Sequence, residues 1–127
     1  MRPRYADLFR RMRDPDPELA DAAFDAVLFD REEAVPELIE GYEKAKKDAE
    51  LRFLCVQLLG FSGSKAGIPT LVAALEDKSA RVRAEACRSL EDIGASEVAA
   101  AVRARLDDLD EDVRIAAMEA LEELKGA

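Results

Sequence analysis

One pattern occurs twice in this chain, as DKSARVRAEACRSLEDI at residues 77–93 and as DLDEDVRIAAMEALEEL at residues 108–124. The pair Val82-Arg83 returns 31 residues later as Val113-Arg114, and the small and apolar positions that follow it return as well. A fixed period of about this length is typical of stacked helix pairs, because each pair can bury its apolar face only against its neighbours. The repeat predicts an all-α fold, an α-solenoid of stacked antiparallel helix pairs.

Helical periodicity extends over the rest of the chain, with apolar residues three and four positions apart. Residues that cap or stop a helix bound these segments, such as Asp30 before the third helix and Gly63 after the fourth. Two helices fall in the two copies of the repeat. The other six are predicted over residues 3–13, 17–29, 32–47, 49–61, 64–75 and 96–107.

The eight helices are expected to form one domain, residues 1–127, in which leading and trailing helices alternate. The leading helices align on Leu19, Leu51, Val82 and Val113. The chain is divided into a half repeat at 3–13, repeats at about 16–47, 48–77 and 79–107, and a terminal helix at 110–125.

The composition limits the partners that the chain can have. Acidic residues number 28 against 19 basic ones, which gives a formal net charge of -9. Such a chain repels phosphate groups, so we expect neither a nucleic acid nor an anionic membrane among its partners. No apolar run reaches the length that spans a bilayer.

The cysteines and the first residues bear on localisation. Cys55 and Cys87 fall on the apolar faces of neighbouring helices, about 8 to 10 Å apart, which is too far for an undistorted disulfide. Two free thiols favour a reducing compartment. Residues 1–13 are charged and lack the apolar segment of a secretory signal, so we expect a cytoplasmic protein.

Charge is distributed unevenly along the chain. Residues 1–13 carry five Arg and one Asp, a net charge of +4, whereas residues 14–43 carry eleven acidic residues and one Arg, a net charge of -10. One interpretation is solvated helix faces whose ends complement each other within the chain. The other is a basic tip that meets an acidic partner or the acidic flank of another copy.

The pattern resembles HEAT-type repeats, in the short bacterial form that is also seen in phycobilin lyases. Besides the two copies above, the resemblance rests on Leu59-Gly60, Gly63 and Ala66-Gly-Ile68-Pro69 with Leu71. It covers nearly the whole chain and implies an armadillo-like stack of helix pairs. It does not imply one function, because this repeat serves many unrelated tasks.

The resemblance also implies a ladder of Asp and Arg along the turns between repeats. The Asp side is Asp14, Asp77 and Asp108, and the Arg side is Arg52, Arg83 and Arg114. We interpret these residues as structural, since a carboxylate at a turn can accept hydrogen bonds from a guanidinium and from helix N-terminal amides. Ala20 replaces the first Arg and Lys46 replaces an Asp, so we expect the first repeat to be the least regular.

Residues suited to chemistry are few. The chain has no histidine, and its two cysteines are isolated, so the sequence predicts no catalytic residue, no cofactor and no metal. The glycine-rich segment 60–67 lacks the Gly-Lys-Ser/Thr ending and the preceding strand of a phosphate-binding loop. The acidic segment 107–112 lacks the spacing and central Gly of a calcium loop.

A protein partner is expected on the outward face of the trailing helices, the concave side of such a stack. Arg103 stands in a column that is apolar in the other trailing helices, which marks either function or an exposed end. The candidate partner-binding residues are Arg11, Glu37, Glu40, Thr70, Ala73, Ala101, Arg103 and Arg105.

The last helix offers a second surface. Ile115 and Met118 occupy the column that should face a following repeat. They are either tucked against the preceding helix or form a docking edge, through which a homodimer is possible.

These observations predict a non-enzymatic adaptor or scaffold that binds another protein. One alternative is a phycobilin-lyase-like or chaperone-type role on a tetrapyrrole-bearing protein, which would need a deep pocket or a reactive thiol. A second is an immunity-type inhibitor of a basic toxin. A third, binding of DNA lesions, would need a cationic concave face and conflicts with the overall acidity.

Overall fold

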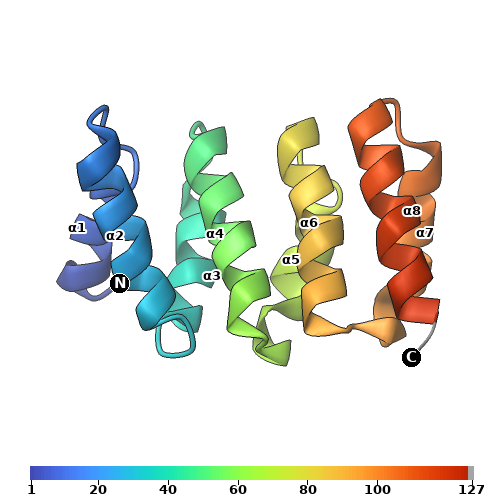
Figure 1. The fold of residues 1–127 in the computed structure, drawn as a ribbon, viewed down its shortest axis with the longest axis horizontal. Helices are drawn as coiled ribbons and strands as arrows, with labels where there is room; N and C mark the ends of the chain where they lie inside the picture. The colour runs from blue at the N-terminus through green and yellow to red at the C-terminus, as the bar shows by residue number, and fades with distance from the viewer. Residues whose placement is uncertain (126–127) are drawn as a thin grey trace.

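The computed structural model describes residues 1–125 of the 127-residue chain. The helices are α1 (Pro3–Arg11), α2 (Pro17–Phe29), α3 (Val35–Lys44), α4 (Ala49–Ser62), η1 (Lys65–Gly67), α5 (Ile68–Ala74), α6 (Ala80–Ile93), η2 (Ser96–Val98), α7 (Ala99–Arg103), η3 (Ala104–Asp107) and α8 (Glu111–Lys125). Over this range there is no strand, and the predicted all-α class is confirmed. Figure 1 shows two layers, a leading layer of α2, α4, α6 and α8 in front of a trailing layer of α1, α3, α5 and α7.

The leading helices stand in the register that the repeat predicts. Val82 of α6 and Val113 of α8 are fully buried, and Leu51 of α4 is half-buried. Leu19 holds the same position in α2 but is 52% exposed, because α2 lies at one end of the described stack. The buried apolar residues form one cluster that runs from α1 to α8, as expected for helix pairs that bury their faces against each other.

Short polar residues and glycines set the ends of the leading helices. Asp16 caps α2 by accepting the backbone N–H two residues on (3.0 Å), and Asp48 caps α4 by accepting the one three residues on (2.9 Å). Gly63 ends α4 and Gly94 ends α6 with φ of 67° and 73°, the left-handed conformation that glycine adopts without steric cost. Local sequence signals therefore position the start of α2 and both ends of α4, the two helices that carry the site described below.

The third helix is shorter than predicted, because α3 spans Val35–Lys44 rather than residues 32–47. Pro36 is its second residue. In a helix that began at residue 32, Pro36 would stand in the interior, where it lacks an N–H donor and its ring strikes the carbonyl four residues back. The predicted cap, Asp30, instead forms an ion pair with Arg4 (2.6 Å).

The seventh helix is interrupted, whereas the sequence predicted one continuous helix over residues 96–107. Only Ala99–Arg103 is α-helical, and η2 and η3 flank it with 3-10 geometry. Helices in proteins are stabilised mainly by packing of an apolar face, and the three alanines at 99–101 bury little area. Weak packing explains why the tighter 3-10 turns take over at both ends.

The basic block at residues 1–13 is bound by acidic residues of the same chain. The ion pairs between its arginines and the acidic block or the next turn are Arg2 with Glu33 and Glu37, Arg4 with Asp30, and Arg13 with Asp48. The interpretation of complementary ends within the chain is therefore the one that the structure supports.

Candidate functional site

The Asp–Arg ladder is present between the regular repeats. Arg52 on α4 donates from Nε to Asp77 Oδ2, and Arg83 on α6 donates from Nε to Asp108 Oδ2, both at 2.9 Å. Each carboxylate also accepts the backbone N–H two residues further on. Each Asp thus holds the start of one leading helix and binds an Arg of the leading helix before it.

The ladder is absent between α2 and α4. Ala20 has no side chain that could reach the next turn, and Lys46 stands where a carboxylate would be needed. A different ion pair, Arg13 with Asp48, joins the turn before α2 to the cap of α4. The prediction that the first repeat departs from the regular pattern is confirmed at this junction.

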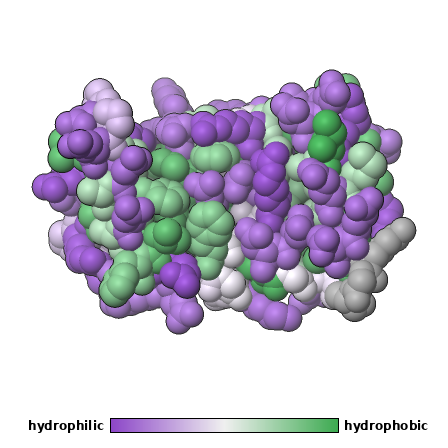
Figure 2. Space-filling model, in the orientation of Figure 1, coloured by the Kyte–Doolittle hydropathy of each residue, from purple (hydrophilic) through white to green (hydrophobic). Residues whose placement is uncertain are grey.

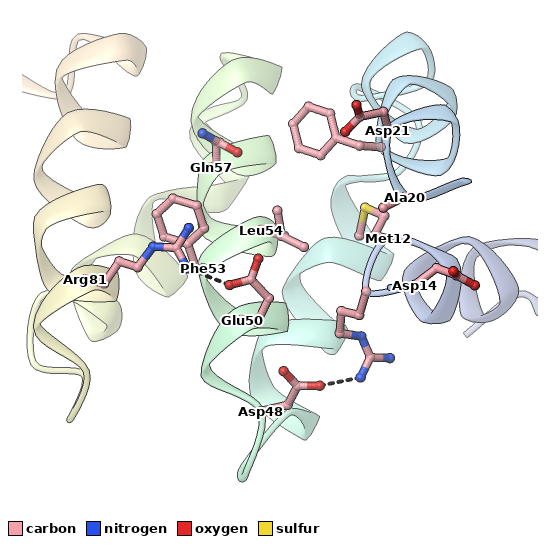
Figure 3. Close-up of a pocket in the computed structure, with 12 residues that line it drawn as sticks. Met12, Asp14, Ala20, Asp21, Asp48, Glu50, Phe53, Leu54, Gln57 and Arg81 are labelled. Atoms are coloured by element: carbon pink, nitrogen blue, oxygen red, sulfur yellow. Dashed lines mark hydrogen bonds and ion pairs between the residues drawn. The ribbon is translucent and has the colours of Figure 1, made fainter. Parts of the chain in front are cut away.

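A groove lies at the same junction, between α2 and α4 on the face of the leading layer (Figure 3). It has a volume of about 760 Å³. We call it the α2–α4 groove. The residues that line it are Met12, Arg13, Asp14, Ala20, Asp21, Phe24, Asp48, Glu50, Phe53, Leu54, Gln57 and Arg81.

Half-buried apolar side chains form the floor of the α2–α4 groove. Phe24 comes from α2, and Phe53 and Leu54 come from α4. Figure 2 shows apolar surface gathered over these two helices, on a face that is mostly hydrophilic elsewhere. The guanidinium of Arg81, from α6, lies 3.8 Å from the centroid of the Phe53 ring, and its Nη1 pairs with Glu50 at 2.5 Å. A cation–π contact with Arg81 thus holds the Phe53 ring in place at the α6 side of the groove.

The polar rim of the α2–α4 groove carries an excess of negative charge. Arg81 is paired with Glu50 and Arg13 with Asp48, whereas Asp14 and Asp21 form no ion pair within residues 1–125. Asp14 accepts only the backbone N–H of residue 16 (2.8 Å), and Asp21 is exposed. An apolar floor beneath two spare carboxylates suits a ligand that has both an apolar side and positive charge.

Groups suited to covalent chemistry lie away from the groove. Cys55 and Cys87 are free thiols with no exposed surface, and burial raises the pKa of Cys55 to about 12 and that of Cys87 to about 11. Within the part of the chain that the structure describes, no cluster of three His, Cys, Asp or Glu could hold a metal ion. No helix in the same range is long and apolar enough to cross a membrane.

Two of the predicted partner-binding residues, Glu37 and Thr70, are buried, which corrects their assignment to the outward face. Glu37 is 5% exposed, because Arg2 covers it and donates from Nε (2.7 Å) and Nη2 (2.8 Å) to its carboxylate. These hydrogen bonds lower the pKa of Glu37 to about 2. Thr70 and Ala101 hold the equivalent register position and are buried and half-buried, so this position faces a neighbouring helix.

The other predicted residues of the trailing layer differ in exposure. Arg11, Ala73 and Arg103 are exposed, and Glu40 is half-buried and paired with Lys44 (2.8 Å). Arg105 donates to the Leu75 carbonyl (3.2 Å) and to Asp108 Oδ2 (3.3 Å), so it supports the ladder.

At the other end of the stack, Ile115 is 41% exposed and Met118 is 52% exposed. They form an exposed apolar edge. Neither side chain is fully covered by the preceding helix, and a docking role for this edge stays a prediction.

The α2–α4 groove was missed from the sequence because Phe24, Phe53 and Leu54 match ordinary core positions of an amphipathic helix. A signal was nevertheless present. Ala20 and Lys46 break the ladder at one junction only, and a broken junction is where neighbouring helices can separate.

Comparison with known proteins supports the architecture. The profile described as HEAT repeats matches residues 35–122. No curated protein matches the chain. Among solved structures, human deoxyhypusine hydroxylase, in complex with glycerol, is similar with a TM-score of 0.72 and 27% identity over 97% of this chain.

The complex of CpcE and CpcF of phycocyanin lyase from Nostoc sp. PCC7120 is similar with a TM-score of 0.53 and 19% identity over 97% of this chain. At that identity the likeness shows the fold alone. This chain spans 44% of the hydroxylase chain and 65% of the lyase chain.

These structures correct one expectation from the sequence. We expected a non-enzymatic protein, but both similar structures are those of catalytic proteins, so this architecture occurs in enzymes. The profile match covers more than half of the chain, and the two-layer stack and the Asp–Arg ladder agree with it. The chain belongs to the HEAT repeat family.

Proposed function

We propose that the α2–α4 groove binds an apolar, positively charged segment of another protein, and that this binding serves an enzymatic reaction on that protein. The observation that carries the proposal is the pairing of an apolar floor, Phe24, Phe53 and Leu54, with the spare carboxylates of Asp14 and Asp21. A basic amphipathic helix matches both features, since its apolar anchors would fill the floor and its Lys or Arg would reach the rim.

The form of the groove favours a protein segment over a small molecule. Small-molecule sites bury most of the ligand surface, whereas the α2–α4 groove is open along the face of the leading layer. Arg81 already orders the Phe53 side chain, so Phe53 would lose little conformational entropy when a partner binds against it. A preformed aromatic anchor is typical of the centre of a protein interface.

The enzymatic part of the proposal draws support from the similarity to deoxyhypusine hydroxylase, at 27% identity over 97% of this chain. Because this chain spans only 44% of that one, we assign it the part of holding a protein substrate in position. The carboxylates and guanidinium groups of the rim are suited to that task, since they orient a bound segment through charge-assisted hydrogen bonds.

The proposal is tested by fluorescence anisotropy with a labelled amphipathic peptide that has leucines at helical spacing on one face and lysines on the other. We expect Asp21→Lys to weaken binding about tenfold, which corresponds to about 1.4 kcal/mol. Glu119→Lys is the matched control, because Glu119 is an exposed carboxylate on α8 outside the groove. Equal effects of the two variants, or no binding by the unaltered chain, would contradict the proposal.

A further inference from the structure

The Asp–Arg ladder has an open position at each end of the stack. Asp14 accepts the backbone N–H two residues on (2.8 Å), as Asp77 (2.9 Å) and Asp108 (3.0 Å) do, but no guanidinium reaches it within residues 1–125. Arg114 donates from Nη1 to the Asp108 carbonyl (2.7 Å), as Arg83 does to the Asp77 carbonyl (2.8 Å). Within the same residues, no carboxylate pairs with Arg114.

Each end of the stack also exposes apolar side chains in the matching column. On α8, Ile115 and Met118 hold the positions at which α4 and α6 contact the following leading helix. On the opposite end, Leu19 is 52% exposed and lines, with Leu8 and Ala22, a hollow of about 380 Å³ between α1 and α2. Figure 1 places α1 and α2 at one end of the molecule and α7 and α8 at the other.

We propose that copies of this chain associate head to tail, so that the α7–α8 end of one copy packs on the α1–α2 end of the next. Arg114 of one copy then binds Asp14 of the next, as Arg52 binds Asp77 and Arg83 binds Asp108 within the chain. Ile115 and Met118 fill the hollow that Leu8, Leu19 and Ala22 line. The contact between copies continues both the Asp–Arg ladder and the cluster of buried apolar residues, in the register that they have within one chain.

Charge favours a second copy in this orientation over a symmetric contact of two α8 helices. Residues 107–125 carry eight acidic residues against two basic ones, so two such ends repel each other. The α1–α2 end, residues 3–29, carries six acidic residues against four basic ones, a net charge of -2, so it repels the acidic α8 end less than a second α8 end would. A head-to-tail contact does not close on itself, so the assemblies should lengthen as concentration rises.

The test uses two blocked variants, and sedimentation velocity measures the mass of the full 127-residue chain. We call the α1–α2 end the head and the α7–α8 end the tail. The variant with Ile115→Glu and Met118→Glu has a blocked tail. The variant with Leu19→Glu and Ala22→Glu has a blocked head. All four residues are exposed, so both variants should keep their helix content by circular dichroism. The unaltered chain should gain mass with concentration, each variant alone should stay monomeric, and an equimolar mixture should form dimers and nothing larger.

Three outcomes would overturn the proposal. The unaltered chain could remain monomeric up to about 1 mM, which would mean that any self-association has a Kd weaker than about 1 mM. The head-blocked variant alone could still dimerise, which would identify a symmetric contact through α8. The mixture could also fail to form dimers. If one pair of glutamates impairs folding, the single substitutions Leu19→Glu and Ile115→Glu provide a milder blocked head and blocked tail, and each should weaken association about tenfold.

The four blocking positions do not line the α2–α4 groove, so peptide binding by these variants should be unchanged. Loss of self-association and loss of peptide binding can therefore be distinguished.

Discussion

Arg52 forms a bidentate pair with Asp77, donating from Nε to Oδ2 (2.9 Å) and from Nη2 to Oδ1 (3.2 Å). The contact is buried on both sides, and Tyr42 adds a third hydrogen bond by donating from its hydroxyl to Asp77 Oδ2 (2.7 Å). Arg52 also donates from Nη1 to the carbonyl of Ala45 (2.8 Å). A single ion pair thus ties together α4, the turn before it and the turn before α6.

Removing one partner of this pair should be costly. Asp77→Ala leaves the Arg52 guanidinium buried without a counter-charge, and we expect the free energy of unfolding to fall by about 3 to 5 kcal/mol. Glu97→Ala is the matched control, because the Glu97–Lys65 pair is exposed and should change stability by less than about 1 kcal/mol. Urea denaturation measures the free energy of unfolding of both variants. If Asp77→Ala lowered it as little as Glu97→Ala does, the ladder would not be a stabilising element.

Acid should weaken the contact between the N-terminal residues and α3. The hydrogen bonds from Arg2 lower the pKa of Glu37 from 4.5 to about 2 in the folded state. A lowered pKa stabilises the fold fully above the unfolded pKa, and this stability is lost as pH falls from about 4.5 towards 2. Asp108 acts in the same direction, because the hydrogen bond from Arg83 lowers its pKa.

The contribution of Glu37 is isolated by comparing urea midpoints of the unaltered chain and Glu37→Gln at neutral pH and at about pH 2.5. The comparison is needed because burial raises the pKa of Glu85, which has the opposite effect. We expect the gap between the two proteins to narrow in acid. A gap of constant size would contradict the assignment.

Gly60 permits the close approach of α4 and α6. A Cβ at this position would lie 2.6 Å from Ser89 Oγ and 2.8 Å from Ser89 Cα, and the Ser89 hydroxyl is held by the Val56 carbonyl (2.9 Å). Gly60→Ala should therefore destabilise the fold by about 1 to 3 kcal/mol, although alanine favours a helix. Gly67→Ala is the control, since its nearest contact would be with the Leu59 side chain, 3.2 Å from Cδ2, with no backbone atom among its nearest neighbours. A stabilising effect of Gly60→Ala in thermal unfolding would show that the helices can separate freely.

The two cysteines should be inert in the folded protein. Cys55 and Cys87 have no exposed surface, and burial raises the pKa of both thiols, which leaves almost no thiolate at neutral pH. We expect a disulfide reagent to label both at the rate of unfolding, with acceleration in urea. Rapid labelling of either thiol without denaturant would contradict this and would favour a lyase-like reaction through that cysteine.

The fold could be predicted largely from the sequence because the deciding contacts repeat. Val82 and Val113 stand in the same column of successive leading helices, and Arg83 reaches Asp108 across the same spacing as Arg52 reaches Asp77. Where each contact lies one repeat away, the period of the pattern predicts the partner as well as the helix.

The remaining features depend on contacts outside the period. Burial of Glu37 requires Arg2 from the segment before α1, and the start of α3 depends on the position of Pro36. The α2–α4 groove depends on the Arg13–Asp48 pair, which replaces the ladder at one junction. None of these contacts belongs to the repeat, so helical periodicity could not reveal them.

Backbone amide shifts of the isotopically labelled chain, recorded by NMR during titration with the leucine–lysine peptide, map the binding surface residue by residue. Binding in the α2–α4 groove should perturb the amides of residues 12–14 before α2, 20–24 on α2 and 48–57, from the cap of α4 into that helix, and leave those of α3, α5 and α7 unchanged. Perturbations confined to α3, α5 and α7 would place the binding surface on the opposite layer and contradict the proposed function.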